Sequence, residues 1–308
     1  MASTTKNKKS KTIYHYPEQW NENMPEGPEV ENVRLELQPL ISKKVDRIHL
    51  TTLSQKYPKY NGKQPFFDQF SKKTIFEIAR FGKFLVWRFT DIEAVILNHL
   101  GMTGKWCLYK DNLKLPSIAN HVKVIIHMIS PPSALFNDIR NFGQFKVFHS
   151  FEKVKQYNPI RSLGVDGLAT PFPLDEFLIR LAKKNFADKP IGEVLLNQRL
   201  VAGIGNIYKA ESLFHSKIHP LRRVKTLSNN EREKLGLSIG EILQKALHDG
   251  GSTMEFQPYE LPSGKTGEAQ RWHRVYNREG ESCVICGNEI YRMVQKDRST
   301  YWCSQCQK

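Results

Sequence analysis

One short segment of the sequence, Met24-Pro25-Glu26-Gly27-Pro28-Glu29, contains residues that could catalyse a covalent reaction. If translation starts at Met24 and this methionine is removed, Pro25 carries a free secondary amine. An α-amino group titrates near pH ~8, so a usable fraction is uncharged at neutral pH. Such an amine can attack a carbon at the aldehyde oxidation level and form an iminium. Glu26 stands beside it to pass protons, and we therefore predict covalent catalysis by Pro25.

The residues before this segment decide whether Pro25 can react. Residues 1–23 lack the apolar core of a signal peptide and carry several lysines among serines and threonines. We expect residues 1–24 to be a basic extension that is disordered or not translated. If the extension stays attached, the Pro25 nitrogen is an amide and cannot be a nucleophile. The alternative interpretation is that the segment is only an acidic helix start, since Pro and Glu favour the first turn.

Four of the five cysteines form two pairs with metal-binding spacing. The pair Cys283 and Cys286 is followed, after sixteen residues, by Cys303 and Cys306. This spacing predicts one zinc ion held by four thiolates, with iron–sulfur or disulfide chemistry as alternatives. Because four thiolates leave no position for water, the zinc is predicted to be structural. Arg298 lies near the tip of the hairpin between the pairs, where it could reach a phosphate or a reaction centre.

The charge of the chain indicates a polyanionic partner. Lys and Arg number 46 against 31 Asp and Glu, which gives a formal charge of +15. Such an excess favours a nucleic acid as the partner. No apolar run reaches the roughly 18 residues of a membrane-spanning helix, so no membrane partner is expected. We expect an intracellular monomer, nuclear if its source is eukaryotic.

The pattern of apolar residues predicts an α+β chain of several domains. Residues 40–150 alternate as strands do, which predicts an antiparallel β-sandwich of roughly eight strands in a catalytic domain over 25–150. A linker is expected over 151–170, followed by a helical domain over 171–256. Residues 257–271 have little apolar content and are expected to form a mobile loop. The zinc finger takes residues 272–308.

Two loops of the predicted sandwich have side chains suited to opening a stack of bases. Met102 lies between glycines in one loop, and Arg140 and Phe142 lie in the other. A thioether, a guanidinium and an aromatic ring could wedge into the stack and fill the space of an extruded base. The alternative is that Met102 and Phe142 are core residues.

Two predicted turns, one before a helix and one in a β-hairpin, carry polar groups that could contact a ligand. Gly203-Ile204-Gly205 precedes Asn206 at a helix start, where outward backbone amides could bind a phosphate. Packing of the turn against its own helix is the alternative. Lys83 is expected just past the glycine turn of a β-hairpin.

Five motifs, in this order, resemble those of the formamidopyrimidine-DNA glycosylase and endonuclease VIII family. They are Pro25-Glu26-Gly27-Pro28-Glu29, Arg80-Phe81-Gly82-Lys83, Arg140-Asn141-Phe142-Gly143, Gly203-Ile204-Gly205-Asn206-Ile207-Tyr208 and the four-cysteine finger. The likeness runs from Met24 to Lys308. It implies an N-terminal β-sandwich, a helix–two-turn–helix domain and a zinc finger, with damaged DNA bound across the cleft.

The resemblance implies a role for each matching residue. Pro25 would attack C1′ of the damaged nucleotide, and Glu26 would protonate the sugar oxygen as the ring opens. Lys83 would pair with a phosphate and take part in elimination, while Arg298 would bind phosphate and assist the second, δ, elimination. Asn206 would hold the phosphate beside the lesion. The void left by the base would be occupied by Met102, Arg140 and Phe142.

These features together predict a bifunctional DNA glycosylase and abasic-site lyase of base-excision repair. Gly27 resembles the endonuclease VIII branch, so oxidised pyrimidines are the expected substrates. Residues 275–283 and Phe142 resemble the formamidopyrimidine branch, and oxidised purines such as 8-oxoguanine are the alternative. A non-catalytic DNA-damage-binding protein is a second alternative. A zinc-ribbon transcription or RNA-binding factor would account only for residues 272–308 and the charge.

Overall fold

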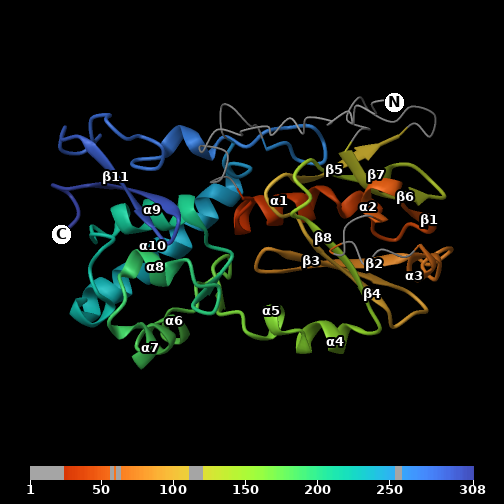
Figure 1. The fold of residues 1–308 in the computed structure, drawn as a ribbon, viewed down its shortest axis with the longest axis horizontal. Coiled ribbons are helices and arrows are strands. Elements are labelled where there is room, and N and C mark those ends of the chain that lie inside the picture. The colour runs from red at the N-terminus through yellow and green to blue at the C-terminus, as the bar shows by residue number, and fades with distance from the viewer. Residues whose placement is uncertain (1–23, 56–58, 60–63, 111–120, 254–258) are drawn as a thin grey trace, which may run out of the picture.

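The structure, a computed structural model, describes residues 24–55, 59, 64–110, 121–253 and 259–308 of the chain. Residues 1–23 of the expected basic extension therefore lie outside the described residues. The β-sandwich forms one half of the long axis in Figure 1, and the helical domain with the finger forms the other. The chain is thus divided into two halves that meet in the middle of this view.

Eight antiparallel strands form the sandwich, as two four-stranded sheets. One sheet has the order β1-β6-β7-β5, and the other has the order β2-β3-β4-β8. The sandwich expected from the sequence is therefore confirmed. The strands are β1 (Val45–Leu50), β2 (Ile75–Phe81), β3 (Phe84–Phe89), β4 (Val95–His99), β5 (Gly104–Tyr109), β6 (Val122–Met128), β7 (Ser133–Asp138) and β8 (Gln144–Phe148).

The two sheets are joined by a core rich in aromatic rings. Trp87 of β3 packs on Trp106 of β5, with ring centroids 4.9 Å apart. The indole N–H of Trp106 donates to Asn98 Oδ1 at 2.9 Å, so the polar edge of this buried ring has a partner. Helix α1 (Gly27–Glu36) lays two buried valines against the same core. This packing fixes the helix that begins beside Pro25.

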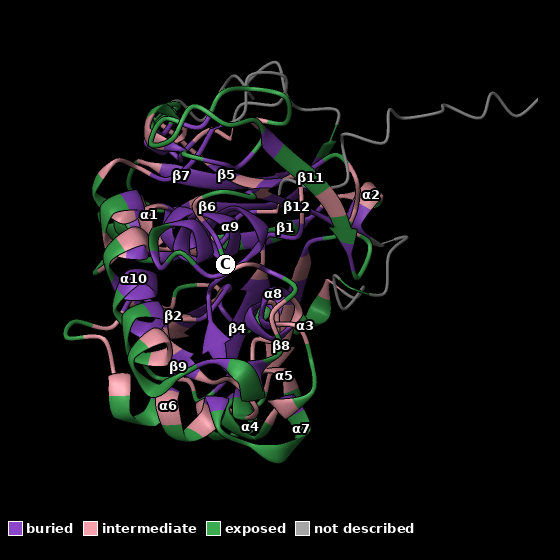
Figure 2. Ribbon diagram, turned by 90° about the vertical axis from the view of Figure 1, so that its left-hand side faces the viewer, coloured by how far each residue is buried: buried purple, intermediate pink, exposed green. Residues whose placement is uncertain are grey.

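The helical domain is built on two packed helices, α9 (Asn206–His215) and α10 (Asn229–His248). Helix α9 is buried along nearly its whole length, as Figure 2 shows. Ser228 caps α10, and Glu231 completes the capping box by accepting from the Ser228 N–H at 2.8 Å.

The shorter helices are α2 (Thr52–Gln55), α3 (Pro65–Asp68), α4 (Phe151–Gln156), α5 (Asn158–Arg161), α6 (Leu174–Leu181), α7 (Lys184–Ala187) and α8 (Ile191–Leu195). Single 3₁₀ turns are η2 (Gln38–Leu40), η5 (Val224–Thr226) and η6 (Ala269–Trp272).

An ion-pair cluster ties the two halves together inside the segment 151–170. Strand β9 (Val165–Asp166) lies there and pairs in parallel with β10 (Val201–Ala202). Asp166 accepts two hydrogen bonds from Arg80 of β2, at 3.1 and 2.7 Å. Arg80 also donates to Glu31 of α1 at 2.8 Å, and its side chain is only 8% exposed. This segment, expected to be a linker, thus carries α4, α5 and β9 and makes buried contacts with the sandwich.

The zinc finger is a β-hairpin of β11 (Ile290–Gln295) and β12 (Arg298–Cys303). Its two-residue turn, Lys296-Asp297, has positive φ at both positions (49° and 59°), as tight hairpins of this kind require. Strand β12 packs against α9, the central helix of the neighbouring domain. The fingertip is therefore placed by the helical domain.

The described part of the expected mobile loop, residues 259–271, lies against the sandwich. The Leu108 N–H donates to the Pro262 carbonyl at 3.1 Å. Lys105 and Glu260 form an ion pair at 2.8 Å. Residues 257 and 258 of that prediction lie outside the described residues.

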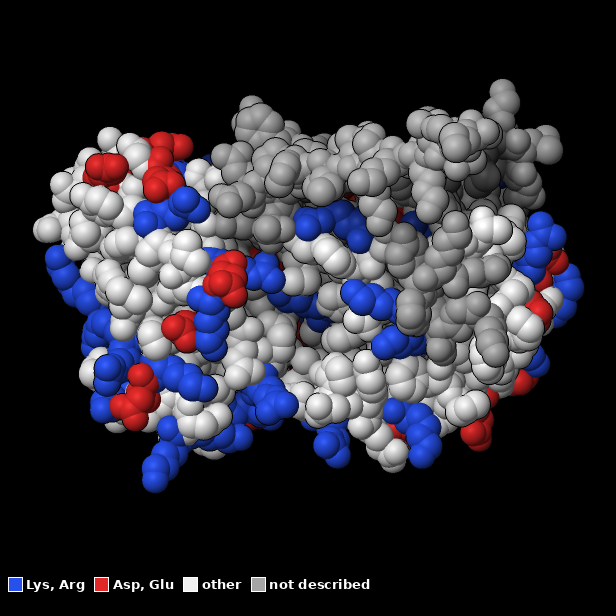
Figure 3. All heavy atoms as spheres, viewed as in Figure 1, with Lys and Arg blue, Asp and Glu red and all other residues white. Residues whose placement is uncertain are grey.

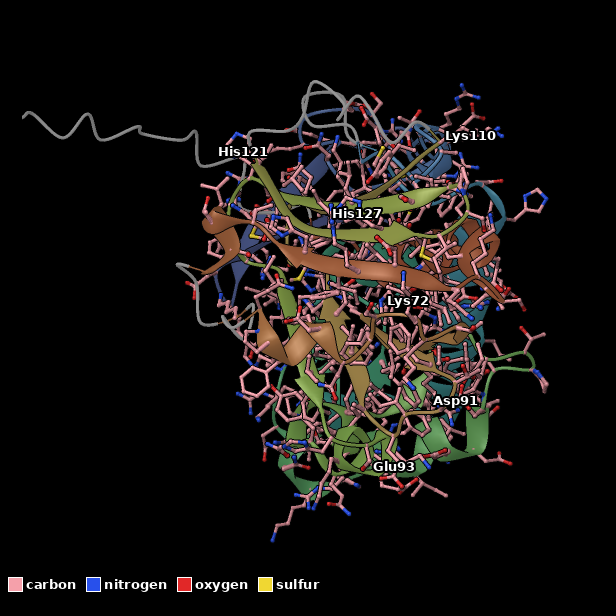
Figure 4. All side chains as sticks on the ribbon, turned by 90° about the vertical axis from the view of Figure 1, so that its right-hand side faces the viewer. Lys72, Asp91, Glu93, Lys110, His121 and His127 are labelled. Atoms are coloured by element: carbon pink, nitrogen blue, oxygen red, sulfur yellow. The ribbon has the colours of Figure 1, made fainter. Side chains whose placement is uncertain are left out.

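Positively charged side chains border the junction of the two halves. Figure 3 shows Lys and Arg side chains around the hollow between the halves. Figure 4 shows the end of the sandwich that faces away from the helical domain, where Lys72, Asp91 and His127 lie. Charges of both signs meet at that end, and Lys72 pairs with Asp46 at 2.6 Å. No helix among the described residues has the length and apolar character needed to cross a lipid bilayer.

Candidate active site

Pro25 and Glu26 are buried at the N-terminus of α1, at the junction of the two halves. The Glu26 N–H donates to Glu29 Oε2 at 2.8 Å, which closes the first turn of the helix. The Gly27 N–H donates to the Gly203 carbonyl at 2.7 Å. The main chain around Pro25 is therefore held from both domains.

The Glu26 carboxylate is bound by backbone amides at the start of α9. Gly205 N–H donates to it at 2.6 Å, Ile207 N–H at 2.8 Å and Tyr208 N–H at 3.4 Å. These amides were expected to bind a phosphate, but the structure uses them for an acid of the same chain. The positive end of the helix and the N–H donors favour the charged carboxylate. Burial outweighs them and raises the pKa of Glu26 to about 7, so it can give or take a proton at neutral pH.

Glycine is required in the turn that supplies these amides. A Cβ on Gly205 would overlap the carboxyl carbon of Glu26. Gln198 braces the same turn, since its side chain accepts from Gly203 N–H at 3.0 Å and donates to the Ile204 carbonyl at 2.7 Å. The turn is thus shaped to seat one carboxylate.

Lys83 and Arg298 bring positive charge to this acid. Lys83 lies within the β2–β3 turn, immediately after Gly82 (φ +57°), rather than just past the turn as predicted. The Lys83 side chain is buried, and this burial lowers its pKa, while the charges of Glu26 and Glu29 raise it. The Arg298 charge also lowers the Lys83 pKa. The fingertip, the hairpin turn and α1 therefore converge on one site.

Asn206 lies beside the site but is bonded to the finger. Its Nδ2 donates to the Ser299 carbonyl at 2.6 Å, next to Arg298. Its Oδ1 accepts from the buried Lys209 at 2.7 Å, and Lys209 donates to Thr300 Oγ1 at 2.7 Å. In this structure Asn206 therefore fixes the strand that carries Arg298, and phosphate binding by Asn206 stays a prediction.

Glu29 is the end of a buried polar chain that sequence reasoning missed. Its Oε1 accepts from the Tyr208 hydroxyl and from Ser252 N–H, the latter at 2.7 Å. Tyr208 and Ser252 hydroxyls lie 3.1 Å apart, and Ser252 Oγ lies 3.0 Å from His273 Nε2. Tyr208 donates its single hydroxyl proton to Glu29, so the Ser252 hydroxyl donates to Tyr208 and the His273 proton sits on Nε2.

The protonation states of His273 and Tyr208 agree with hydrogen-bond donation toward Glu29. Burial lowers the pKa of His273 to about 4, which leaves the ring neutral at pH 7. Burial and the neighbouring acids raise the pKa of Tyr208, which keeps its hydroxyl a donor. Gly251 (φ +85°) lets the main chain approach, since a Cβ there would lie 2.7 Å from Glu29 Oε1. The sequence signal nearest these groups is the pair of glycines at 250 and 251, which is also typical of the end of a helix.

The two loops with Met102 and with Arg140 and Phe142 lie side by side on the sandwich. A Cβ on Gly101 would lie 2.5 Å from the Gly143 nitrogen, so the two backbones touch. The Phe142 side chain is 41% exposed and the Arg140 guanidinium lies 4.9 Å from its ring centroid. Phe142 is therefore a surface residue and Met102 is half-buried, whereas the alternative placed both in the core.

The four finger cysteines fit a zinc ion. Their sulfur atoms all lie within 4.8 Å of one another. Cys283 and Cys306 sulfurs are 3.8 Å apart, and those of Cys286 and Cys303 are 3.4 Å apart. A tetrahedral site with Zn–S bonds of about 2.3 Å requires sulfur separations of about 3.8 Å. The set holds one structural zinc ion and leaves no position for water.

Three protein families match successive parts of the chain. "Formamidopyrimidine-DNA glycosylase N-terminal domain" matches residues 24–145, and "Formamidopyrimidine-DNA glycosylase H2TH domain" matches residues 163–258. "Zinc finger found in FPG and IleRS" matches residues 280–308. These matches divide the chain as the structure does, into sandwich, helical domain and finger.

Whole proteins match as well. The formamidopyrimidine-DNA glycosylase of Listeria innocua is 35% identical, over 92% of this chain and 100% of its own length. That of Rhodopseudomonas palustris is 34% identical over the same shares. Both matches cover nearly the whole chain and the full length of the relative.

Solved structures show the same fold. Lactococcus lactis Fpg in complex with abasic-site DNA has a TM-score of 0.79 and 32% identity, over 92% of this chain and 99% of that one. MutM (Fpg) from Thermus thermophilus has a TM-score of 0.78 and 31% identity, over 92% and 98%. The chain therefore belongs to the formamidopyrimidine-DNA glycosylase family, and it is a DNA-repair enzyme, a DNA N-glycosylase with abasic-site lyase activity.

Proposed function

We propose that the chain, with Pro25 as its first residue, uses this amine to remove an oxidised base and then cuts the strand. The amine attacks C1′ of the damaged nucleotide and the base leaves, while Glu26 protonates the sugar ring oxygen as the ring opens. The iminium that results acidifies the C2′ proton, whose loss expels the 3′ phosphate. A second, δ, elimination expels the 5′ phosphate, and water then releases the Pro25 amine.

One observation carries this proposal: an acid poised for proton transfer, a buried lysine and the fingertip arginine converge beside Pro25. Glu26 supplies the acid, because burial raises its pKa to about 7. Lys83 and Arg298 supply cations that pair with phosphates on either side of the lesion. The family match that begins at residue 24 supports a mature chain that starts at Pro25.

The remaining DNA contacts follow the same arrangement. Met102, Arg140 and Phe142 fill the space of the extruded base from the sandwich side. Asn206 holds the phosphate beside the lesion, once DNA competes with the Ser299 carbonyl for its amide. A single chain carries all of these groups, so the protein acts as a monomer on damaged DNA.

Oxidised purines, including formamidopyrimidines, are the proposed preferred substrates. Gly27 had favoured pyrimidines, but it has a packing reason to be glycine, since a Cβ there would lie 3.1 Å from Gly203 Cα. The relatives at about 35% identity are formamidopyrimidine-DNA glycosylases, which supports the purine class. A Lactococcus lactis relative has been solved with DNA containing Fapy-dG and with DNA containing an oxidised pyrimidine. Oxidised pyrimidines are therefore retained as secondary substrates.

Borohydride trapping tests the nucleophile. Protein that begins at Pro25 is incubated with an oligonucleotide carrying 8-oxoguanine and sodium borohydride, which reduces an iminium to a stable amine. We expect a covalent adduct attached to the N-terminal peptide at Pro25. Protein that retains residues 1–24 should give no adduct, because its Pro25 nitrogen is an amide. Adducts of undiminished yield in that longer protein would overturn the terminal-amine mechanism.

Parallel single-turnover assays test the lesion class. Matched duplexes carry 8-oxoguanine, a formamidopyrimidine or an oxidised pyrimidine at the same position. We expect the two purine lesions to be excised faster. Faster excision of the pyrimidine would reverse the proposed preference and leave the Schiff-base chemistry intact.

A further inference from the structure

The loops of Met102 and Phe142 are joined by one buried carboxylate. Asp138 closes β7 and is fully buried. Its Oδ1 accepts from the Thr103 hydroxyl at 2.7 Å, and its Oδ2 accepts from the Gly143 N–H at 2.7 Å. One oxygen thus holds the first loop and the other holds the second.

Thr103 adds a further hydrogen bond between the two loops. Its Oγ1 accepts from the Arg140 N–H at 3.0 Å while its proton goes to Asp138. The segment 140–143 is therefore pinned at both ends, at Gly143 by Asp138 and at Arg140 through Thr103. Thr103 is the residue next to Met102 in the chain, so the same bond also restrains the main chain that carries the Met102 side chain.

The positive charge of a buried lysine compensates the charge of Asp138. Lys123 of β6 is almost fully buried, and burial lowers its pKa while the charge of Asp138 raises it. The nearby cation and the two hydrogen-bond donors offset part of the cost of burying this carboxyl group. The anchor is thus part of the sandwich, whereas the side chains that it restrains lie at the surface.

We propose that Asp138 and Thr103 are positioning residues that couple the two loops into one rigid wedge, so that Met102 and Phe142 enter the base stack together. The proposal rests on the void-filling role given to these side chains in the proposed function. Insertion must oppose base stacking, and a wedge that is already ordered loses less conformational freedom at that step. Loops that moved independently would have to be ordered during insertion.

The test compares a substrate that needs the wedge with one that does not. Thr103→Val keeps the size of the side chain and removes the hydroxyl. We expect excision of a lesion from duplex DNA to slow by about tenfold. Cleavage of a single-stranded oligonucleotide with an abasic site should stay within about twofold of the wild type, since no opposite strand leaves a void there. Thr103→Ser, which keeps the hydroxyl, should behave like the wild type on both.

Coupling of the two loops also predicts that the effects of two substitutions on the excision rate are not additive. Met102→Ala should slow duplex excision in the wild-type background and have little further effect when combined with Thr103→Val. Thr226→Val is the matched control, because it removes an exposed hydroxyl that bonds only the Arg223 carbonyl, far from the loops. Both duplex and single-stranded rates should be unchanged by it.

The outcomes separate this inference from the proposed function. Equal slowing of the duplex and single-stranded reactions by Thr103→Val, equal slowing by Thr103→Ser, or multiplicative effects with Met102→Ala would each overturn the coupling alone. A wild-type protein that neither excises the lesion from duplex DNA nor cleaves the abasic strand would overturn the proposed function, and the coupling with it.

Discussion

The acid pocket around Glu26 and the loop pair around Asp138 both contain a buried carboxylate, but the two carboxylates have opposite roles. In the pocket, backbone amides of the turn 203–208 hold the carboxylate of Glu26, which is itself the reactive group. In the loop pair, the carboxylate of Asp138 holds a backbone amide and a hydroxyl so that other side chains can work. The first arrangement serves chemistry and the second serves shape.

This difference indicates which amino-acid substitutions each region can tolerate. The donors to Glu26 belong to the main chain, so their positions depend on glycines and on the docking of α9 rather than on exchangeable side chains. The loop pair is held through a half-buried threonine hydroxyl, and its side chains can vary in size without altering the reacting groups. Substitutions in the pocket should therefore affect every substrate, whereas substitutions in the loop pair should affect duplex DNA only.

The largest expected effect comes from Glu26→Gln. The amide cannot donate a proton to the sugar oxygen, so single-turnover base excision should fall by at least about 100-fold. In the wild type the pKa of Glu26 is about 7, so the protonated fraction shrinks as the pH rises through that value. Excision should therefore decline above about pH 7 in a stopped-assay pH profile. An unchanged rate in Glu26→Gln would remove Glu26 from the proton-transfer role.

Gly205→Ala should give the next largest effect. The added methyl group overlaps the Glu26 carboxyl carbon, and crowding of this kind costs about 1–3 kcal/mol of folding free energy. We expect slower excision on duplex and single-stranded substrates alike, together with a lower free energy of unfolding in urea. Gly264→Ala is the control, because its backbone has φ +85° but no atom lies within 4 Å of the new methyl. It should lose some stability and keep its excision rate.

Phe142→Ala should have the smallest and most selective effect. The ring is exposed and contacts Arg140 and Lys59 rather than the core. Loss of one stacking surface should slow duplex excision by about tenfold and leave the stability of the protein unchanged. Cleavage of the single-stranded abasic oligonucleotide should also be unchanged. Equal losses on both substrates would erase the contrast between the two regions.

Much of the fold could be predicted because its signals are local. The cysteine spacing specifies the finger, and Ser228 with Glu231 specifies the start of α10. Strand β7 has no local signal, because all six of its residues are buried and no alternation marks them. A strand covered on both faces gives no period-2 pattern.

The candidate site was predicted less completely because its contacts are remote in sequence. The residue types at Glu26, Lys83 and Arg298 indicated the chemistry. Nothing near Gly205 in the chain shows that its amide binds Glu26, since 179 residues separate the two. His273 likewise sits in no motif, and its hydrogen-bond partner Ser252 lies 21 residues away in the sequence. Such pairings depend on how the domains dock.

The distance along the chain between Glu26 and its amide donors has a consequence for biosynthesis. During translation the N-terminal segment leaves the ribosome long before α9 exists, so the acid emerges without the groups that seat it. The catalytic pocket is completed only after the second domain has been made and has docked on the first. Incomplete chains therefore lack an assembled catalytic centre.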